Sequence, residues 1–285
     1  MGIKISESPI KTLYLKIKSD TEIFDYYTGP FAEYEKYLVD QVFWDIEPTR
    51  LIVGHKSCNI LEIGCGDGRI CEYLARDGHK VIGIDRSINA ISAFKKKIES
   101  DNNGFLAKCE AHQMDVFNEN VRTLISKTDS ILISNISVNL FSEKKLRRMF
   151  CQMKDSARYG TKLYVSCLSP DGVNKFKKYD STAIGSLHFV PYSDVNGRTK
   201  IMNVWLEFDS SNKILFGQWL VDLGCYRSYE NRYAFSILNH RIWSSDEVRA
   251  LMMECGLTSY VLEKRGVINV GGLSGCDLDF VVGCF

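Results

Sequence analysis

Short apolar runs alternate with helical patterns between residues 58 and 168, and this alternation constrains the fold more than any other feature. The runs typical of strands are residues 58–63, 80–84, 129–134 and 161–167, and a further, weaker strand is expected within residues 105–114. Helical patterns separate them, and Ser87 and Ser142 stand where helix caps are expected. Because parallel strands need such crossovers, the alternation predicts a mostly parallel sheet with helices on both faces.

The pattern changes after Pro170. Residues 170–243 contain alternating segments such as KIMNVWLEF and ILFGQWLVDL, which predict a hairpin or small antiparallel sheet. A helix is predicted to open at Ser244, and two closing strands follow at 257–263 and 278–284. The predicted fold is therefore α/β: a doubly wound, Rossmann-like, seven-stranded and mostly parallel sheet with an antiparallel β-rich lid insertion.

The N-terminal part shows a helical pattern without the alternating strands of this core. Residues 31–48 carry apolar side chains at helical spacing and are predicted to form one amphipathic helix that ends before Pro48. The predicted division of the chain is an N-terminal helical lid segment at 1–50, an α/β domain at 51–169 and 244–285, and a substrate-covering insertion at 170–243.

Composition limits the partners. The chain has 36 Lys and Arg against 35 Asp and Glu, whereas proteins that bind nucleic acid usually carry a basic excess. A small-molecule substrate is therefore expected, and no nucleic acid. The ten cysteines form no CxxC pair, and several lie in apolar runs, which is typical of reduced thiols. With no apolar run of about 18 residues and no signal-peptide pattern, we expect no membrane span and a cytoplasmic location.

The main chemical signal is the glycine-rich segment LEIGCGDGR at residues 61–69. Glycine lets a backbone approach a ligand closely, and a helix start behind it offers free amide donors. The dinucleotide fingerprint GxGxxG fits at Gly64 and Gly66 but meets Arg69 at its sixth position. Glu62, just before the turn, would repel a phosphate and attract a cationic sulfonium. Charge thus favours S-adenosylmethionine over NAD.

A second acid supports this interpretation. Asp85 follows the apolar run at 80–84 and lies 21 residues beyond Gly64. An acid at an offset of about 20 residues binds ribose hydroxyls in nucleotide sites of this kind. Its place after the second strand puts it at the carboxyl edge of the sheet, where ligands of open α/β sheets bind.

The two motifs, LEIGCGDGR and then GID, resemble the first two motifs of class I S-adenosylmethionine-dependent methyltransferases of the small-molecule type. The resemblance covers roughly residues 58–168 and the closing strands. It implies that the glycine turn contacts the methionine part of the donor and that Asp85 holds the ribose hydroxyls. It also implies that Asp115 accepts from the adenine amino group, and that residues 134–137 face the donor methyl. The implied cofactor-binding residues are Tyr27, Glu62, Gly64, Cys65, Gly66, Asp85, Arg86, Met114, Asp115, Val116 and Asn135.

Two of these roles have alternatives. Asp115 could be a helix N-cap before Phe117 or a surface acid. Tyr26 and Tyr27 resemble an aromatic lid segment of the family, but aromatic side chains are also ordinary packing residues.

The resemblance implies an enzyme that transfers a methyl group to a nitrogen or oxygen of a small molecule by in-line displacement, driven by orientation. A base is needed only for a hydroxyl or a protonated amine. Four side chains of the insertion are weak candidates for it: His188, His240, Tyr192 and Tyr226. Ser134 and Asn135 stand where metal-assisted members place aspartates, so no metal is expected. Members that modify nucleic-acid bases often carry prolines in this segment, and their absence here opposes a DNA or RNA substrate.

Three alternatives stay open. They are a non-catalytic S-adenosylmethionine-binding or regulatory subunit, an RNA methyltransferase, and a nucleotide-dependent oxidoreductase. The mismatch at Arg69 and the acid at Glu62 oppose the last of these. A homodimer is also left open.

Overall fold

The structure is a computed structural model, and it describes residues 8–285 except 41–43, 176–185, 195, 225–229 and 269–274. These residues fall into two compact units. The α/β unit comprises residues 43–174 and 243–285, and the β unit comprises residues 1–42 and 175–242. Residues 43–50, which the sequence grouped with the N-terminal segment, lie in the α/β unit.

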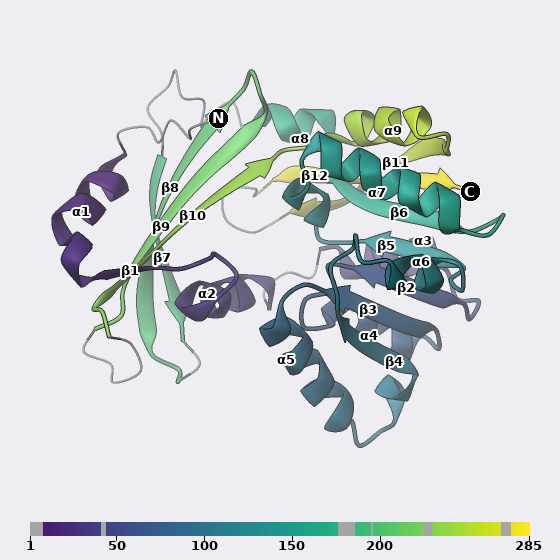
Figure 1. Ribbon diagram of the computed structural model, residues 1–285, viewed down its shortest axis with the longest axis horizontal. Coiled ribbons are helices and arrows are strands. Elements are labelled where there is room, and N and C mark those ends of the chain that lie inside the picture. The colour runs from purple at the N-terminus through teal and green to yellow at the C-terminus, as the bar shows by residue number, and fades with distance from the viewer. Residues whose placement is uncertain (1–7, 41–43, 176–185, 195, 225–229, 269–274) are drawn as a thin grey trace. The chain divides into compact units, whose positions relative to one another are not determined.

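The α/β unit is built on a seven-stranded sheet with the order β11-β12-β6-β5-β2-β3-β4 (Figure 1). Strands β2 to β6 pair in parallel, whereas β12 and β11 are antiparallel. This confirms the predicted fold class. The strands are β2 (Asn59–Ile63), β3 (Lys80–Asp85), β4 (Cys109–Gln113), β5 (Ser130–Ile133), β6 (Lys162–Leu168), β11 (Thr258–Ile268) and β12 (Cys276–Cys284).

Helices cover both faces of this sheet. Successive side chains of a strand point to opposite faces, and in β5 Ile131 and Ile133 join one buried cluster while Leu132 joins the other. The first cluster includes α6 (Asn120–Ile125), α7 (Glu143–Ser156) and α9 (Ser245–Glu254). The second includes α3 (Ile46–Val53), α4 (Arg69–Arg76) and α5 (Ile88–Glu99). A further helix, α8, spans Pro170–Lys175.

The expected caps are present. Ser87 Oγ accepts from Ala90 N at 3.3 Å at the start of α5, and Ser142 Oγ accepts from Lys145 N at 3.4 Å at the start of α7. Ser244 forms a capping box with Glu247 before α9. Each cap satisfies amide groups that have no partner inside the helix.

The weaker strand expected within residues 105–114 is β4. A 3-10 helix, η2 (Phe105–Lys108), precedes it. Gly104 turns the backbone at φ +69°, and Asp101 Oδ2 accepts from Leu106 N at 2.5 Å. Leu106 in this segment is buried. Local turn chemistry therefore sets where β4 begins.

The β unit is a five-stranded sheet with the order β1-β10-β9-β8-β7. The pairs from β10 to β7 are antiparallel, and β1 adds to β10 in parallel. The strands are β1 (Thr21–Ile23), β7 (Ser186–Ser193), β8 (Thr199–Asp209), β9 (Ile214–Asp222) and β10 (Tyr233–Arg241). The helices are α1 (Pro9–Ile17), η1 (Lys18–Asp20) and α2 (Gly29–Val39).

The single helix predicted at 31–48 is wrong. Helix α2 ends at Val39, and α3 begins only at Ile46, with Pro48 inside its first turn. Proline is tolerated there because the first amide groups of a helix have no internal acceptor. Among the described residues, no helix is both long and apolar enough to cross a membrane.

Candidate functional site

The glycine turn, residues 64–68, connects β2 to α4 and adopts left-handed backbone angles. Gly64, Gly66 and Gly68 have φ values of +73°, +56° and +82°. Ile84 O of the neighbouring strand accepts from Gly64 N at 2.9 Å and from Cys65 N at 3.1 Å. These bonds hold the turn against the carboxyl end of β3.

The glycines serve different needs. A Cβ at Gly68 would overlap the ring of Phe94, so a side chain there would push α4 away from α5. Apart from its chain neighbours, nothing lies within 4 Å of the position that a Cβ would take at Gly66. Gly68 therefore permits close packing, whereas Gly66 leaves bare backbone beside open space. Cys65, between Gly64 and Gly66, is buried.

Asp85 ends β3 and lies directly beside this turn. Its Oδ2 accepts from Gly66 N at 3.1 Å, and its Oδ1 accepts from Ser87 N at 2.8 Å. The carboxylate thus joins the glycine turn to the start of α5 while it stays half-buried. The structure brings together Gly64, Gly66 and Asp85, the three residues on which the sequence interpretation depended most.

Glu62 lies beneath the turn. Its side chain is 1% exposed, and its carboxylate accepts hydrogen bonds from Ser134 Oγ and, at 2.9 Å, from Cys71 Sγ. Burial raises the pKa of this carboxyl to about 7, although these hydrogen bonds and the charge of Arg69 oppose the shift. The carboxylate connects β2, α4 and the end of β5. A direct contact of Glu62 with a ligand stays a prediction.

The sequence interpretation did not foresee the partner of Arg69. Its guanidinium forms two hydrogen bonds with Asp45, at 2.8 and 2.7 Å, and the Asp45 side chain is fully buried. This bidentate pair fixes the start of α4 to the start of α3. No local pattern links the two residues, and Arg69 had been noted only as a mismatch to the dinucleotide fingerprint.

The segment after β4 lies at the same edge of the sheet. Met114 N donates to Asp85 O at 2.8 Å, which places the segment next to β3. Asp115 is exposed, and its Oδ1 accepts from Phe117 N at 2.9 Å, so it caps a local turn. Val116 is buried in the core, and Arg86 is exposed. The proposed contacts of these residues with a ligand stay predictions.

The segment after β5 makes a second left-handed turn. Asn135 and Ile136 have φ values of +49° and +50°, although neither is glycine. Ser137 lies against the glycine turn, because a Cβ at Gly64 would be 3.5 Å from its Oγ. We call residues 134–137 the post-β5 turn.

The remaining predicted residues belong to the β unit. Tyr27 contacts the ring of Tyr26 with centroids 5.2 Å apart. Tyr192 is 1% exposed and lies on β7 with its ring centroid 5.3 Å from that of Tyr34, whereas His188 lies on the same strand and is half-buried. His240 lies on β10, and burial lowers its pKa to about 4. Tyr226 lies outside the described residues. The predicted roles of these side chains in ligand binding and catalysis stay predictions.

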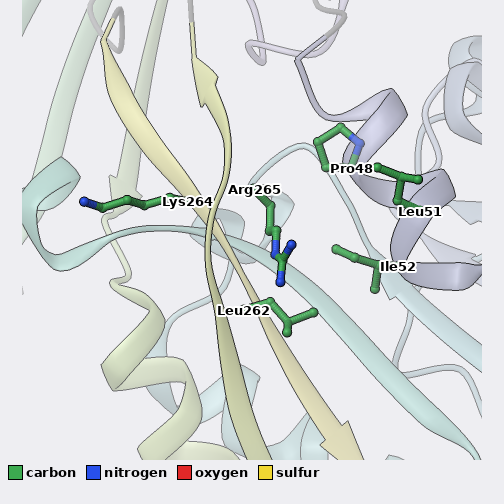
Figure 2. Close-up of a pocket in the computed structure, with 6 residues that line it drawn as sticks. All are labelled: Pro48, Leu51, Ile52, Leu262, Lys264 and Arg265. Carbon is green, nitrogen blue, oxygen red and sulfur yellow. The ribbon is translucent and has the colours of Figure 1, made fainter.

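A separate groove of about 350 Å³ lies between α3 and β11 (Figure 2). Its lining residues are Pro48, Leu51, Ile52, Leu262, Lys264 and Arg265. Figure 2 shows the Lys264 side chain pointing away from the groove. Strand β11 is four strand spacings from β2, about 19 Å at the usual spacing of ~4.8 Å. The groove is therefore distinct from the site at the glycine turn.

Comparisons with known proteins agree with this geometry. Residues 60–160 match the family model of a methyltransferase domain. A search of curated proteins found no significant match. Among solved structures, the glycopeptide N-methyltransferase MtfA complexed with S-adenosyl-L-homocysteine is 14% identical, with 98% of each chain covered and a TM-score of 0.58.

Two further structures are similar at the level of the fold. An S-adenosylmethionine-dependent methyltransferase from Clostridium acetobutylicum is 14% identical, with 88% of this chain and 96% of that chain covered and a TM-score of 0.60. An amino pentose methyltransferase from Micromonospora echinaspora is 16% identical, with 89% and 97% covered and a TM-score of 0.57. Residues 60–160 therefore match a methyltransferase domain, and the fold of the chain is similar to that of S-adenosylmethionine-dependent methyltransferases.

Proposed function

We propose that the chain binds S-adenosylmethionine beside the glycine turn and transfers its methyl group to a nitrogen or oxygen of a small molecule. The observation that carries this proposal is the Asp85 carboxylate next to the bare backbone of Gly66. Two of the similar structures are a glycopeptide N-methyltransferase and an amino pentose methyltransferase, and this similarity favours an amine-bearing acceptor.

The residues present fit such a donor. Open space at Gly66 leaves room for a ligand against the backbone, and a carboxylate beside it can accept hydrogen bonds from two neighbouring ribose hydroxyls. In this arrangement Gly64 and Cys65 would face the methionine part, and Asp115 the adenine amino group. When bound, the sulfonium would supply an electrophilic methyl group.

The protein's own contribution would be orientation. An in-line displacement needs the acceptor lone pair opposite the sulfur, and a small misplacement strongly reduces the rate. The site residues lie on the ends of β2, β3, β4 and β5, which the sheet holds in fixed register. We further propose that the β unit selects the acceptor. There His240, whose pKa is lowered to about 4, would be neutral near pH 7 and a weaker base than an ordinary histidine.

Calorimetry on Asp85→Ala tests the donor site. Loss of two charge-assisted hydrogen bonds should weaken S-adenosylmethionine binding about 100-fold, which corresponds to about 2.7 kcal/mol. Asp129→Ala is the matched control, because Asp129 accepts from Asn59 N at 2.8 Å at the opposite edge of the same sheet. The dissociation constant of Asp129→Ala for S-adenosylmethionine should equal that of the wild type.

Two outcomes would overturn the proposal. One is an unchanged dissociation constant in folded Asp85→Ala, and the other is tighter binding of NAD than of S-adenosylmethionine. Release of S-adenosylhomocysteine, measured with amino sugars, aryl amines and phenols as acceptors, then tests transfer itself. A chain that binds the donor but releases no product with any acceptor class would instead fit a non-catalytic subunit.

A further inference from the structure

The post-β5 turn is strained in a way that the glycine turn is not. Ile136 adopts φ +50° and ψ +23°, a left-handed conformation in which a β-branched residue is an outlier. Other non-glycine residues at positive φ in the described ranges are Asn135, Lys213 and Lys264, none of which is β-branched. Such a conformation persists only where the surroundings enforce it, and it is concentrated at functional sites.

Ser166 supplies the central constraint. Strand β5 stops pairing at Ile133, whereas its neighbour β6 continues to Leu168. The Ser166 hydroxyl donates to Ile133 O at 3.3 Å and accepts from Ile136 N at 2.9 Å. The side chain is fully buried, so water does not compete for these groups. Ser166 therefore takes over the pairing that β5 gives up and forces the chain to turn.

The two ends of the turn are fixed as well. At the start, Ser134 Oγ donates to the buried Glu62 carboxylate. At the exit, Asn139 N donates to Ile136 O at 2.9 Å, and Asn139 Oδ1 accepts from Trp243 N at 3.0 Å. The turn is thus held by bonds to β2, to β6 and to the segment before α9.

The post-β5 turn borders the edge of the sheet at which the proposed donor would bind. Ser137 abuts Gly64, so the post-β5 turn and the glycine turn border the same edge of the sheet. We propose that Ser166 is a positioning residue for methyl transfer, which holds Asn135 and Ile136 in the strained turn so that they orient the donor methyl group and the acceptor. This inference rests on the proposed function, and it concerns the transfer step and not the affinity for the donor.

The first test is Ser166→Ala. We expect kcat for release of S-adenosylhomocysteine to fall at least tenfold, while the dissociation constant of S-adenosylmethionine stays within twofold of the wild type. With [methyl-¹³C]S-adenosylmethionine and no acceptor, the methyl signal of the bound donor should be one sharp line in the wild type and should broaden or split in the variant. Ser166→Thr keeps the hydroxyl and should restore the single line.

Ile136→Gly is the second test and does not depend on the folding of the serine variant. Glycine adopts the same angles without strain, so the melting temperature should not fall while kcat drops and the methyl signal broadens. Lys264→Gly is the matched control, because Lys264 also has a φ of +50°, in the bulge of β11. It should change neither kcat nor the methyl signal.

The outcomes separate the two proposals. A wild-type chain that fails to bind S-adenosylmethionine overturns the proposed function and this inference with it. A wild-type chain that binds the donor, while Ser166→Ala or Ile136→Gly keeps both the sharp methyl line and the wild-type kcat, overturns only the inference. Loss of donor affinity in parallel with kcat would show a general structural role and would also overturn it.

Discussion

The glycine turn and the post-β5 turn follow neighbouring parallel strands of one sheet, and both use left-handed backbone, but they reach it differently. The glycine turn places glycine at each of its three left-handed positions, 64, 66 and 68. The post-β5 turn has Asn135 and Ile136 in that conformation and is held by Ser166. The first turn adopts its shape at little cost, whereas the second stores about 1–3 kcal/mol of strain at Ile136.

The difference indicates what each turn is for. A ligand that lies against the backbone needs glycine, because a Cβ would occupy its place. A turn that must present side chains cannot use glycine, and the surrounding structure has to supply the missing stability. In the post-β5 turn this stability comes from hydrogen bonds to other strands: Ser134 donates to Glu62 of β2, and Ile136 N donates to Ser166 of β6.

The largest effect on stability is expected for Gly68→Ala. The added Cβ would overlap the ring of Phe94, and the φ of +82° is unfavourable for alanine. Overpacking and the left-handed conformation together should lower the free energy of unfolding by about 4 kcal/mol, as measured by urea denaturation. Gly66→Ala is the control: with open space around its Cβ, it should cost only about 1 kcal/mol while weakening donor binding at least tenfold. Equal losses of stability would contradict the division of roles between these glycines.

Glu62→Gln tests the residue that connects the two turns. Burial raises the pKa of the folded carboxyl to about 7 from an ordinary 4.5. Between these pH values the folded chain holds a proton that the unfolded chain has released, so the contribution of Glu62 to stability falls as pH rises. The loss across this window is about 3 kcal/mol, at 1.36 kcal/mol per pKa unit.

The glutamine variant has no such loss. Its free energy of unfolding relative to the wild type should therefore increase by about 3 kcal/mol between pH 4.5 and pH 7. The buried His240 titrates in both proteins and cancels in this difference. Parallel stability curves for the two proteins would mean that Glu62 ionises in the folded chain as it does in water.

Features that depend on residues close together in the sequence could be predicted, whereas contacts between residues far apart in the sequence could not. The mostly parallel sheet and the meeting of Gly66 with Asp85 were predictable, because parallel strands end at one edge and the motif spacing is local. Ser166 and Ile136 are 30 residues apart and lie on different strands, so no spacing rule links them. The strain at Ile136 has no sequence signature either, since isoleucine after a strand is read as ordinary core.

One local prediction failed for a different reason. Pro48 was read as a helix stop, but it occupies the first turn of α3, where proline is equally acceptable. Proline is allowed both just after a helix and in the first turn of one, and the local sequence does not decide between these two positions.

The smallest effect on stability is expected for Asn135→Gly, which tests whether Asn135 or Ile136 carries the strain of the post-β5 turn. Asparagine enters the left-handed region several times more readily than most residues, whereas isoleucine rarely does. Removing the Asn135 side chain should therefore change the free energy of unfolding by no more than about 0.5 kcal/mol in urea denaturation. A gain in stability well above that value would place the strain at Asn135. The post-β5 turn would then be strained at its asparagine and not at Ile136.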